Sequence, residues 1–378
     1  MAEIDLIAGT ATLGKLVEQY EAVRGDLPIT NLYKSGEEEE VEAMDYIWQK
    51  RKRPRTLAGV SSVSGQSYVG KEPDNDYIHS RLIHITIKEK LTPERLFLRS
   101  GPGEYLRSNA SNVIVKTAER ILSQLYMTTE AIGARQLQDV GGVAINAANT
   151  LFPTGAVGMN YNLTIDGGLQ NVAAGAAWDL PATKILSADA QLSDFISLLE
   201  ANGHAAGKFL CQREIVKAIV GNTEAQAWLT ANGGITVEHF KRAVNAAARM
   251  QGQDGVDAGE MSVFSGLGGI PEWHVMHHGF ENRAGTFTRY LDPDKAILLP
   301  PDLTDVLCFI EGPSFIPEGN LVGDVTEAAD MVAMKKGVQL FAMREHDETG
   351  AIWIIGRRSF LPLVKSELGV LQLNSLTT

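Results

Sequence analysis

Residues 272–279, EWHVMHHG, bring together the side chains that most readily bind a transition metal. His274, His277 and His278 are three of the eight histidines of the chain, and Glu272 stands just before them. Imidazole nitrogens combined with a carboxylate are common ligands of zinc, so one hypothesis is a metal centre in a metal-dependent hydrolase. The spacing of these residues and their secondary structure decide whether they can converge on one ion.

The spacing does not fit the helical type of zinc site. His274 and His278 are four residues apart, as that site requires, but Val275 stands where the site has its glutamate. Pro271 and Gly279 enclose the segment too closely for a helix. These positions therefore argue against a helical metalloprotease site.

On a β-strand the same residues divide between two faces. His274 and His278 share one face and His277 lies on the other, because side chains alternate along a strand. Only two histidines then converge, and a third ligand would have to come from elsewhere in the chain. The segment is interpreted as a strand whose histidines are partly exposed or lie at a subunit contact. A hydrolase that uses His274 and His278 is the alternative.

The other reactive residues give no catalytic set. Cys211 lies in the apolar run KFLCQ and Cys308 in VLCFI, which predicts two buried thiols that pack as small hydrophobic side chains. The chain has no phosphate-binding glycine motif ending in Lys-Ser/Thr, no G-x-S-x-G nucleophile motif and no dinucleotide fingerprint. We therefore predict that the protein is not an enzyme and has no catalytic, cofactor-binding or metal-binding residues.

Length and charge narrow the class of protein further. A chain of 378 residues predicts two or three subdomains. The formal net charge of -12 argues against a protein that clamps nucleic acid, although KRKRPR at 50–55 is a local basic run. Two cysteines give no disulfide framework. Because the N-terminal sequence is acidic and no apolar stretch approaches 18 residues, we expect a soluble intracellular protein without membrane contact.

Charge blocks mark the first 56 residues. Four consecutive glutamates at 37–40 precede the basic run at 50–55, a pattern typical of an extended, solvated or interacting arm. Residues 57–98 predict a long β-hairpin, because the run SRLIHITIKEK alternates apolar and polar positions and the turn formers GKEPDNDY occupy 70–77. The exposed edges of such a hairpin normally need a partner.

Residues 108–140 predict one very long helix. Their apolar residues recur at helical spacing, and Gly141 and Gly142 end the pattern. About 30 helical residues would span roughly 45 Å. This is far above the mean length of a helix and indicates a spine that supports several parts of the structure.

A glycine- and alanine-rich connector ends near residue 183, and helices alternate with strands after it. The end of the chain predicts a hairpin that turns at 347–350, followed by the short strand GVLQLNSL. The other predicted elements are helices at 187–203, 213–222 and 235–252, a buried strand at 208–212, strands on either side of a turn at 282–285, and apolar strands at 295–300 and 306–316.

Three segments carry a resemblance to a known family. They are LTPERLFLRSGPGE (91–104), EWHVMHHGFENRAGTFTRYLDPDKAILLP (272–300) and RRSFLPLVKSELGVLQL (357–373). The first is similar to the family's segment between hairpin and spine helix. The second is similar to its strand, turn, Gly-Thr, Pro-Asp and apolar strand, and the third to its Leu-Pro ending. With the order of elements, the chain resembles the lambda-type major capsid protein E family of tailed bacteriophages over nearly its whole length.

This resemblance implies an α+β fold of the Hong Kong 97 capsid type. Such a subunit has an N-terminal arm, an E-loop hairpin, a peripheral P-domain built on a spine helix, and an axial A-domain with a mixed sheet flanked by helices. The implied boundaries are 1–56 for the arm, 57–98 for the E-loop, 99–183 with 336–378 for the P-domain, 108–140 for its spine helix, and 184–335 for the A-domain.

The resemblance also implies a structural function. Pentamers and hexamers of the chain are expected to form the icosahedral shell of a virion, assembled in the cytoplasm of a bacterial host. The shell encloses double-stranded DNA, which it contacts non-specifically. Expected partners are other copies of the chain and scaffolding, portal and cement or decoration proteins. The alternative within the same fold is the shell of a bacterial nanocompartment, which encloses an enzyme.

Overall fold

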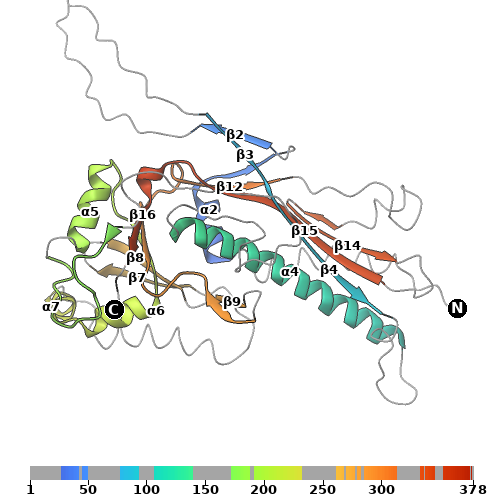
Figure 1. The fold of residues 1–378 in the computed structure, drawn as a ribbon, viewed down its shortest axis with the longest axis horizontal. Coiled ribbons are helices and arrows are strands. Elements are labelled where there is room, and N and C mark those ends of the chain that lie inside the picture. The colour runs from blue at the N-terminus through green and yellow to red at the C-terminus, as the bar shows by residue number, and fades with distance from the viewer. Residues whose placement is uncertain are drawn as a thin grey trace, which may run out of the picture.

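The computed structural model shows a long helix beside two six-stranded sheets and a protruding two-stranded ribbon (Figure 1). The helix predicted at 235–252, the turn at 70–77 and the basic run at 50–55 lie outside the described residues. The structure describes residues 27–41, 45–49, 77–92, 106–138, 172–187, 191–231, 261–267, 270–276, 279–281, 285–312, 333–335, 337–344, 352–374 and 376.

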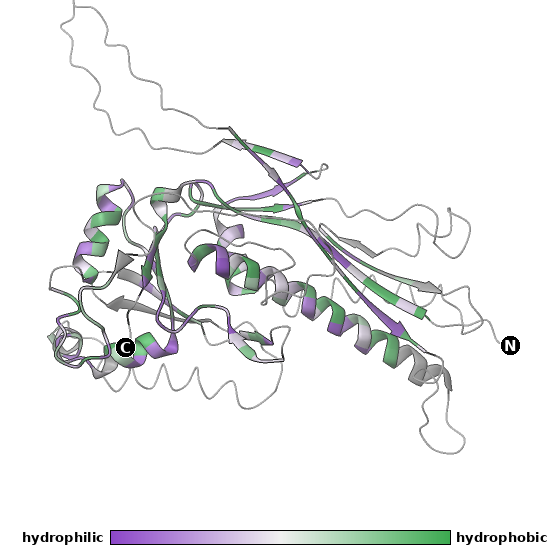
Figure 2. Ribbon diagram, in the orientation of Figure 1, coloured by the Kyte–Doolittle hydropathy of each residue, from purple (hydrophilic) through white to green (hydrophobic). Residues whose placement is uncertain are grey.

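The longest helix is α4, Leu106–Gln138, with 33 residues. The prediction of a helix at 108–140 is confirmed, with both ends two residues earlier. At about 1.5 Å per residue, α4 is roughly 50 Å long. Hydrophobic and hydrophilic residues are interleaved along it (Figure 2), and every residue from Thr129 to Gln138 is buried. In the described parts of the chain, no helix is both long enough and apolar enough to cross a lipid bilayer.

The first sheet is organised around the long strand β15, Ile352–Val364. Its order is β1–β12–β15–β14–β13, and β4 also pairs with β15. Both β4 and β14 run antiparallel to the first part of β15, which confirms the hairpin predicted to turn at 347–350. The other strands are β1 Glu38–Glu40, β4 Ile83–Leu91, β12 Leu307–Glu311, β13 Ala333–Lys335 and β14 Val338–Arg344.

The helix α4 packs closely against this sheet at a glycine. A Cβ atom on Gly356 would lie only 2.4 Å from the Ile121 side chain and 3.0 Å from that of Leu125. Glycine at this position therefore lets the helix approach the strand. The buried apolar cluster between helix and sheet consists of Leu27, Leu91, Ala118, Ile121, Leu122, Leu125, Tyr126, Val338, Leu340, Ile352 and Ile354.

The second sheet is mixed, with the order β5–β16–β11–β6–β8–β7, and helices α5, α6 and α7 flank it (Figure 1). The ring of Phe209 in its core lies 4.3 Å from that of Trp273 and 6.1 Å from that of Trp178. The strand predicted at 208–212 is confirmed as β6. The elements are β5 Val172–Ala173, α5 Leu192–Ala201, β6 Lys208–Gln212, α6 Arg213–Gly221, α7 Thr223–Ala231, β7 Met261–Leu267, β8 Ile270–Met276, β11 Ala296–Leu299, the 3-10 turn Glu367–Gly369 and β16 Leu371–Asn374.

The sheets do not divide at the predicted domain boundaries, near residues 183 and 335. The strands β12 and β13 precede the second boundary but belong to the first sheet. Conversely, β5 precedes the first boundary and β16 ends the chain, yet both belong to the second sheet. The two halves of the molecule therefore exchange strands, a feature that a division of the chain into consecutive segments does not represent.

The ribbon consists of β2, Asp45–Gln49, and β3, Tyr77–Arg81, which pair antiparallel and point away from the two sheets (Figure 1). This pairing corrects the hairpin predicted at 57–98. The partner of β3 lies in the segment predicted as arm, and β4 pairs with β15. The alternating run at 80–90 predicted the strand β4, but its partner β15 and the pairing of β3 with β2 are set by tertiary contacts that no local pattern contains. The first strand of the predicted hairpin lies outside the described residues.

Residues 28–40 also correct the predicted extended arm. The helix α2, Pro28–Gly36, packs on α4, with Ile29 and Tyr33 buried against Gly133. Proline suits the first position of a helix, because its fixed φ is helical and no backbone N–H is needed there. The glutamate run then forms β1, which lies parallel to β12 at the edge of the first sheet. This part of the arm belongs to the folded body.

We expect Gly356→Ala to lower the free energy of unfolding by about 1–3 kcal/mol, because the added methyl group overpacks the contact with Ile121. Gly221→Ala is the matched control, since a Cβ at Gly221 meets no atom within 4 Å. That variant should stay within about 1 kcal/mol of the parent protein. Urea unfolding followed by tryptophan fluorescence measures both, and equal stabilities of the two variants would contradict the close packing of α4.

Candidate functional site

The structure places His274 on β8, as predicted, and pairs it with a neighbour on the same strand. Its Nε2 atom lies 3.0 Å from Oε2 of Glu272. Burial lowers the pKa of the His274 imidazole, although the bond to Glu272 opposes this effect. Among the described residues, neither side chain belongs to a group of three ligands that could hold a metal ion. His277 and His278 lie outside these residues.

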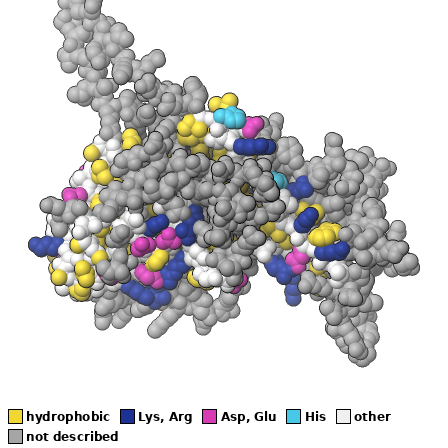
Figure 3. All heavy atoms as spheres, in the orientation of Figure 1, with side chains coloured by type: hydrophobic (Ala, Val, Ile, Leu, Met, Phe, Trp, Pro, Cys, Tyr) yellow, Lys and Arg dark blue, Asp and Glu magenta, His cyan; other side chains and the backbone are white. Residues whose placement is uncertain are grey.

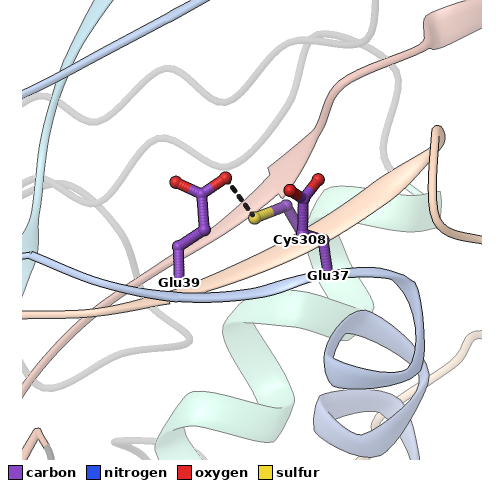
Figure 4. Close-up of side chains that lie close together, drawn as sticks. All are labelled: Glu37, Glu39 and Cys308. Carbon is purple, nitrogen blue, oxygen red and sulfur yellow. Dashed lines mark hydrogen bonds between the residues drawn. The ribbon is translucent and has the colours of Figure 1, made fainter.

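One other group of described residues has metal-ligand chemistry: Glu37, Glu39 and Cys308 (Figure 4). A cation already lies between the carboxylates, because Lys365 Nζ donates to Glu37 Oε2 at 2.6 Å and to Glu39 Oε1 at 2.7 Å. Burial raises the pKa of the Cys308 thiol to about 12, whereas zinc binds the thiolate. The group is an ion-pair cluster that joins β1 to the end of β15.

A second ionic cluster lies on the other face of β1. Lys34 Nζ contacts Glu38 at 2.9 Å and Glu311 at 3.0 Å, and Arg358 contacts the same oxygen of Glu311 at 3.4 Å. The Arg358 side chain is only 1% exposed. Its guanidinium lies over three aromatic rings, at 4.5 Å from Tyr126, 5.5 Å from Phe309 and 5.7 Å from Phe360.

A buried carboxylate fixes α2 to α4. Glu130 accepts hydrogen bonds from the backbone N–H groups of Ile29 (2.7 Å) and Thr30 (2.9 Å) and from the Thr30 hydroxyl (2.9 Å). It thereby satisfies amides in the first turn of α2 and places a negative charge at the positive end of that helix. Tyr33 donates to Gln136 Oε1 at 2.8 Å one turn further on. Burial and the Glu130 charge raise the pKa of Tyr33.

Sequence reasoning missed these polar clusters. The helical spacing of Ile29, Leu32 and Tyr33 after Pro28 is a signal that could have identified α2. Its partner Glu130 stands about a hundred residues later, and no local pattern connects the two. The clusters bind the arm, the long helix and the first sheet into one unit, and nothing in their geometry suggests catalysis.

Exposed hydrophobic side chains mark surfaces that suit a protein contact. The large hydrophobic residues exposed in the described chain are Ile47 at 66%, Phe287 at 61% and Leu180 at 50%. Ile47 lies on the protruding β2, where Trp48 Nε1 donates to the Ser80 hydroxyl at 3.0 Å. A two-stranded ribbon is only marginally stable by itself in water, and Trp48 of β2 is buried in the core of the body whereas Ile47 is exposed.

Phe287 belongs to a second antiparallel pair, β9 Gly279–Glu281 with β10 Phe287–Arg289, which confirms the strands predicted on either side of a turn at 282–285. Residues 282–284 of that turn lie outside the described residues. Basic residues mark a further surface. Lys and Arg side chains lie beside hydrophobic ones over the region of β4 and β15 (Figure 3). There Lys88 and Lys90 lie 5.7 and 5.4 Å from the ring of Trp353.

Comparison with solved structures identifies the fold. The chain is similar to a protein assigned as a prophage capsid protein in Escherichia coli CFT073, with a TM-score of 0.59 and 11% identity, covering 97% of this chain and 98% of that one. The capsid of a native GTA particle follows with a TM-score of 0.43 and 14% identity, covering 92% and 90%. An encapsulin complex from Synechococcus elongatus PCC 7942 has 0.41 and 11%, covering 93% and 89%.

The chain therefore has the α+β capsid fold of the Hong Kong 97 type that its sequence predicted. No protein-family model and no curated protein sequence matches it. The narrower resemblance to the lambda-type E family stays a prediction.

Replacing Glu130 tests the anchor of α2. We expect Glu130→Ala to lower the free energy of unfolding by about 3 kcal/mol, because three donors at the start of α2 lose their acceptor. Glu119→Ala removes an exposed carboxylate from the same helix and should change stability by less than about 0.5 kcal/mol. Urea unfolding of the unassembled subunit measures both, and a Glu130→Ala variant as stable as the control would refute the anchoring role.

Proposed function

We propose that the chain is the major capsid protein of a tailed bacteriophage, and that many copies assemble into the icosahedral shell around its double-stranded DNA. The observation that carries this proposal is the similarity to the Escherichia coli prophage protein over 97% of this chain and 98% of that one. Agreement along the whole length of both chains supports a shared subunit architecture. Because a fold alone does not define a function, the exposed surfaces matter as well.

The protruding ribbon supports assembly on physical grounds. Ordering a chain segment costs about 1–2 kcal/mol of backbone entropy per residue, and among the described side chains of β2 and β3 only Trp48 is buried in its own subunit. Ile47 stays exposed at the far side of the pair. A neighbouring copy that covers the ribbon would bury this side chain and pair with the open edges of the strands. The same argument applies to Phe287 on the β9–β10 hairpin.

The proposed subunit has the parts that the sequence predicted: an arm at 1–56, an E-loop at 57–98, a P-domain at 99–183 with 336–378, and an A-domain at 184–335. Two refinements follow from the strand pairing. The E-loop is proposed to begin at β2, because β2 pairs with β3. The first sheet with α4 is proposed as the P-domain and the second sheet with α5, α6 and α7 as the A-domain.

The proposed function needs no catalysis and no cofactor. Its partners are other copies in pentamers and hexamers, together with scaffolding, portal and cement or decoration proteins, and assembly takes place in the cytoplasm of the bacterial host. The formal net charge of -12 suits a container for DNA, because strong attraction to phosphates would hinder packaging and release. Contact with the enclosed DNA is therefore proposed to be weak and non-specific.

Assembly of the purified chain tests the proposed function directly. The purified chain, alone or co-expressed with the scaffolding protein of its gene neighbourhood, should form closed shells or tubes visible by negative-stain electron microscopy and by light scattering. A strict monomer under all these conditions would contradict the proposal. Native particles that enclose a bacterial enzyme and no DNA would contradict the phage part of it and identify a nanocompartment shell.

A substitution at Ile47 tests whether the ribbon contacts a neighbouring copy. We expect Ile47→Glu to reduce the yield of shells at least about tenfold, because a charge at a contact between subunits is desolvated without a partner. Ile47→Val keeps the side chain apolar and should assemble normally. Circular dichroism and unfolding midpoints of both variants should match the parent subunit, because Ile47 is exposed within it. Normal assembly of Ile47→Glu would exclude this surface from the subunit contacts.

A further inference from the structure

The ribbon is joined to the body of the molecule at two points that differ in kind. At one, β3 continues through the fully buried Leu82 into β4, which pairs with β15 from Ile83 to Leu91. At the other, β2 follows the short strand β1, which covers only Glu38–Glu40 at the edge of the sheet. The first connection is anchored by the long pairing of β4 with β15 and by the burial of Leu82. The second has only three paired residues, so it depends on contacts of the β1 side chains.

The sequence of β1 is poorly suited to a strand. Glutamate is depleted in strands, and like charges on paired positions are destabilising. Glu40 nevertheless faces Glu311 in the register with β12. Two backbone hydrogen bonds flank the strand, from Phe309 N–H to the carbonyl of Glu37 at 2.7 Å and from Val41 N–H to the carbonyl of Glu311 at 3.0 Å. Val41, just after the strand, packs on the buried core, but β1 itself carries only glutamate side chains, so charge must supply most of their attraction.

Two lysines supply that charge, one on each face of β1. Lys365, at the end of β15, bonds Glu37 and Glu39 on one face. Lys34, in the last turn of α2, contacts Glu38 and Glu311 on the other. Because side chains alternate along a strand, each lysine is reached by one set of carboxylates only. β1 is thus fixed by ion pairs from two elements that remain anchored independently of it.

The same carboxylates connect β1 to the ribbon. The Tyr46 hydroxyl on β2 donates to Glu39 Oε2, the second oxygen of the carboxylate that Lys365 binds. The thiol of Cys308, on the neighbouring strand β12, lies 4.0 Å from Oε1 of Glu39 and close to Glu37 (Figure 4). A change that breaks the Lys365 contacts therefore removes the support of the first ribbon strand and opens access to Cys308.

We propose that β1 is an electrostatic latch: its release frees the β2 end of the ribbon, while the β3–β4 connection stays in place, so that the ribbon turns about Leu82. This inference concerns the isolated subunit and does not depend on the proposed capsid function. In a shell, such a latch would adjust the direction of the ribbon without unfolding the sheet. The strength of the latch is set by the contacts of Lys365 with the carboxylates of Glu37 and Glu39.

Acid should open the latch. On the Lys365 face of β1 stand Glu37, Glu39, Tyr46 and Cys308. Burial alone would raise the pKa of Glu39, but hydrogen bonds from Lys365 and Tyr46 outweigh it and hold this pKa below its usual value of 4.5. The carboxylate therefore stabilises docked β1 above that value, and the contribution is lost as the pH falls through the lowered pKa.

Lysine titration acts at the opposite end of the pH scale. Burial would lower the pKa of Lys365, but Glu37 and Glu39 raise it above 10.5, so its contribution is lost only in strong alkali. On the other face, Lys34 and Arg358 share the carboxylate of Glu311. That cluster holds α2 and β12 together whether or not β1 is docked, because its own ion pairs remain. Acid below pH 4.5 should thus release β1 before it unfolds the sheet.

Thiol labelling tests the latch, because the chain has two cysteines and only Cys308 lies on the strand next to β1. We expect Lys365→Met to raise the rate of Cys308 labelling by dithiodipyridine about tenfold, since labelling follows the population of the open form. Cys211, buried in β6, should keep its rate. Lys116→Met removes an exposed lysine from α4 and is the matched control. Acid that protonates Glu39 should raise the rate of Cys308 labelling in the parent protein, as Lys365→Met does at neutral pH.

A double variant, Glu37→Gln with Glu39→Gln, tests the same latch without touching Lys365, in case that variant fails to fold. Hydrogen exchange should become faster in 37–49 and stay unchanged in 83–91 for both variants. Unchanged Cys308 labelling in both variants would overturn the proposal. So would equal acceleration of Cys211 and Cys308, which would indicate global unfolding, and so would equal loss of protection in 83–91, which would place the hinge elsewhere.

Discussion

A buried positive charge on β15 determines how the parts of this molecule fit together. The Arg358 guanidinium is almost fully enclosed, and a buried charge is costly unless it is paired and hydrogen-bonded. Glu311 on β12 supplies the negative partner, Lys34 of α2 shares that carboxylate, and the ring of Tyr126 on α4 covers the guanidinium. Four elements that are distant in the sequence therefore satisfy one another. We infer that the cluster selects one arrangement of α2, α4 and the sheet more than it adds net stability.

Elements that depend on local signals could be predicted from the sequence. The length of α4 and the β14–β15 hairpin follow from periodicity, because their hydrogen bonds form within the helix or between consecutive strands. The strand β6 follows from a short apolar run, although its partners β8 and β11 are distant in the sequence. The order of these elements was specific enough to indicate the capsid fold, although each short motif was not.

Elements that depend on distant partners could not be predicted. The acceptor for the start of α2 is Glu130, and the cation that makes a strand of the glutamate run is Lys365, more than 300 residues away. Read locally, four glutamates indicate a solvated arm, and only their alternation between two lysines makes them a strand. The histidine segment shows the reverse case. Its residues suggested a metal site, but the strand pairs His274 with Glu272 and brings no third described ligand to it.

The two ends of α4 are held by forces of different character. Near its C-terminal end, Glu130, Gln136 and Gln138 hydrogen-bond to defined atoms of α2 and of the segment around Tyr290. Towards its N-terminal end, Ile121 and Leu125 pack on Gly356, and an ion pair between Arg120 and Glu89 joins the helix to β4. Hydrogen bonds are directional, whereas hydrophobic contact is not. The C-terminal end of α4 is therefore fixed to defined atoms, whereas its N-terminal half is held mainly by packing. In the shell proposed above, small shifts of that half of α4 against the sheet would adjust the curvature of a subunit, so that one sequence would fit positions that are similar without being identical.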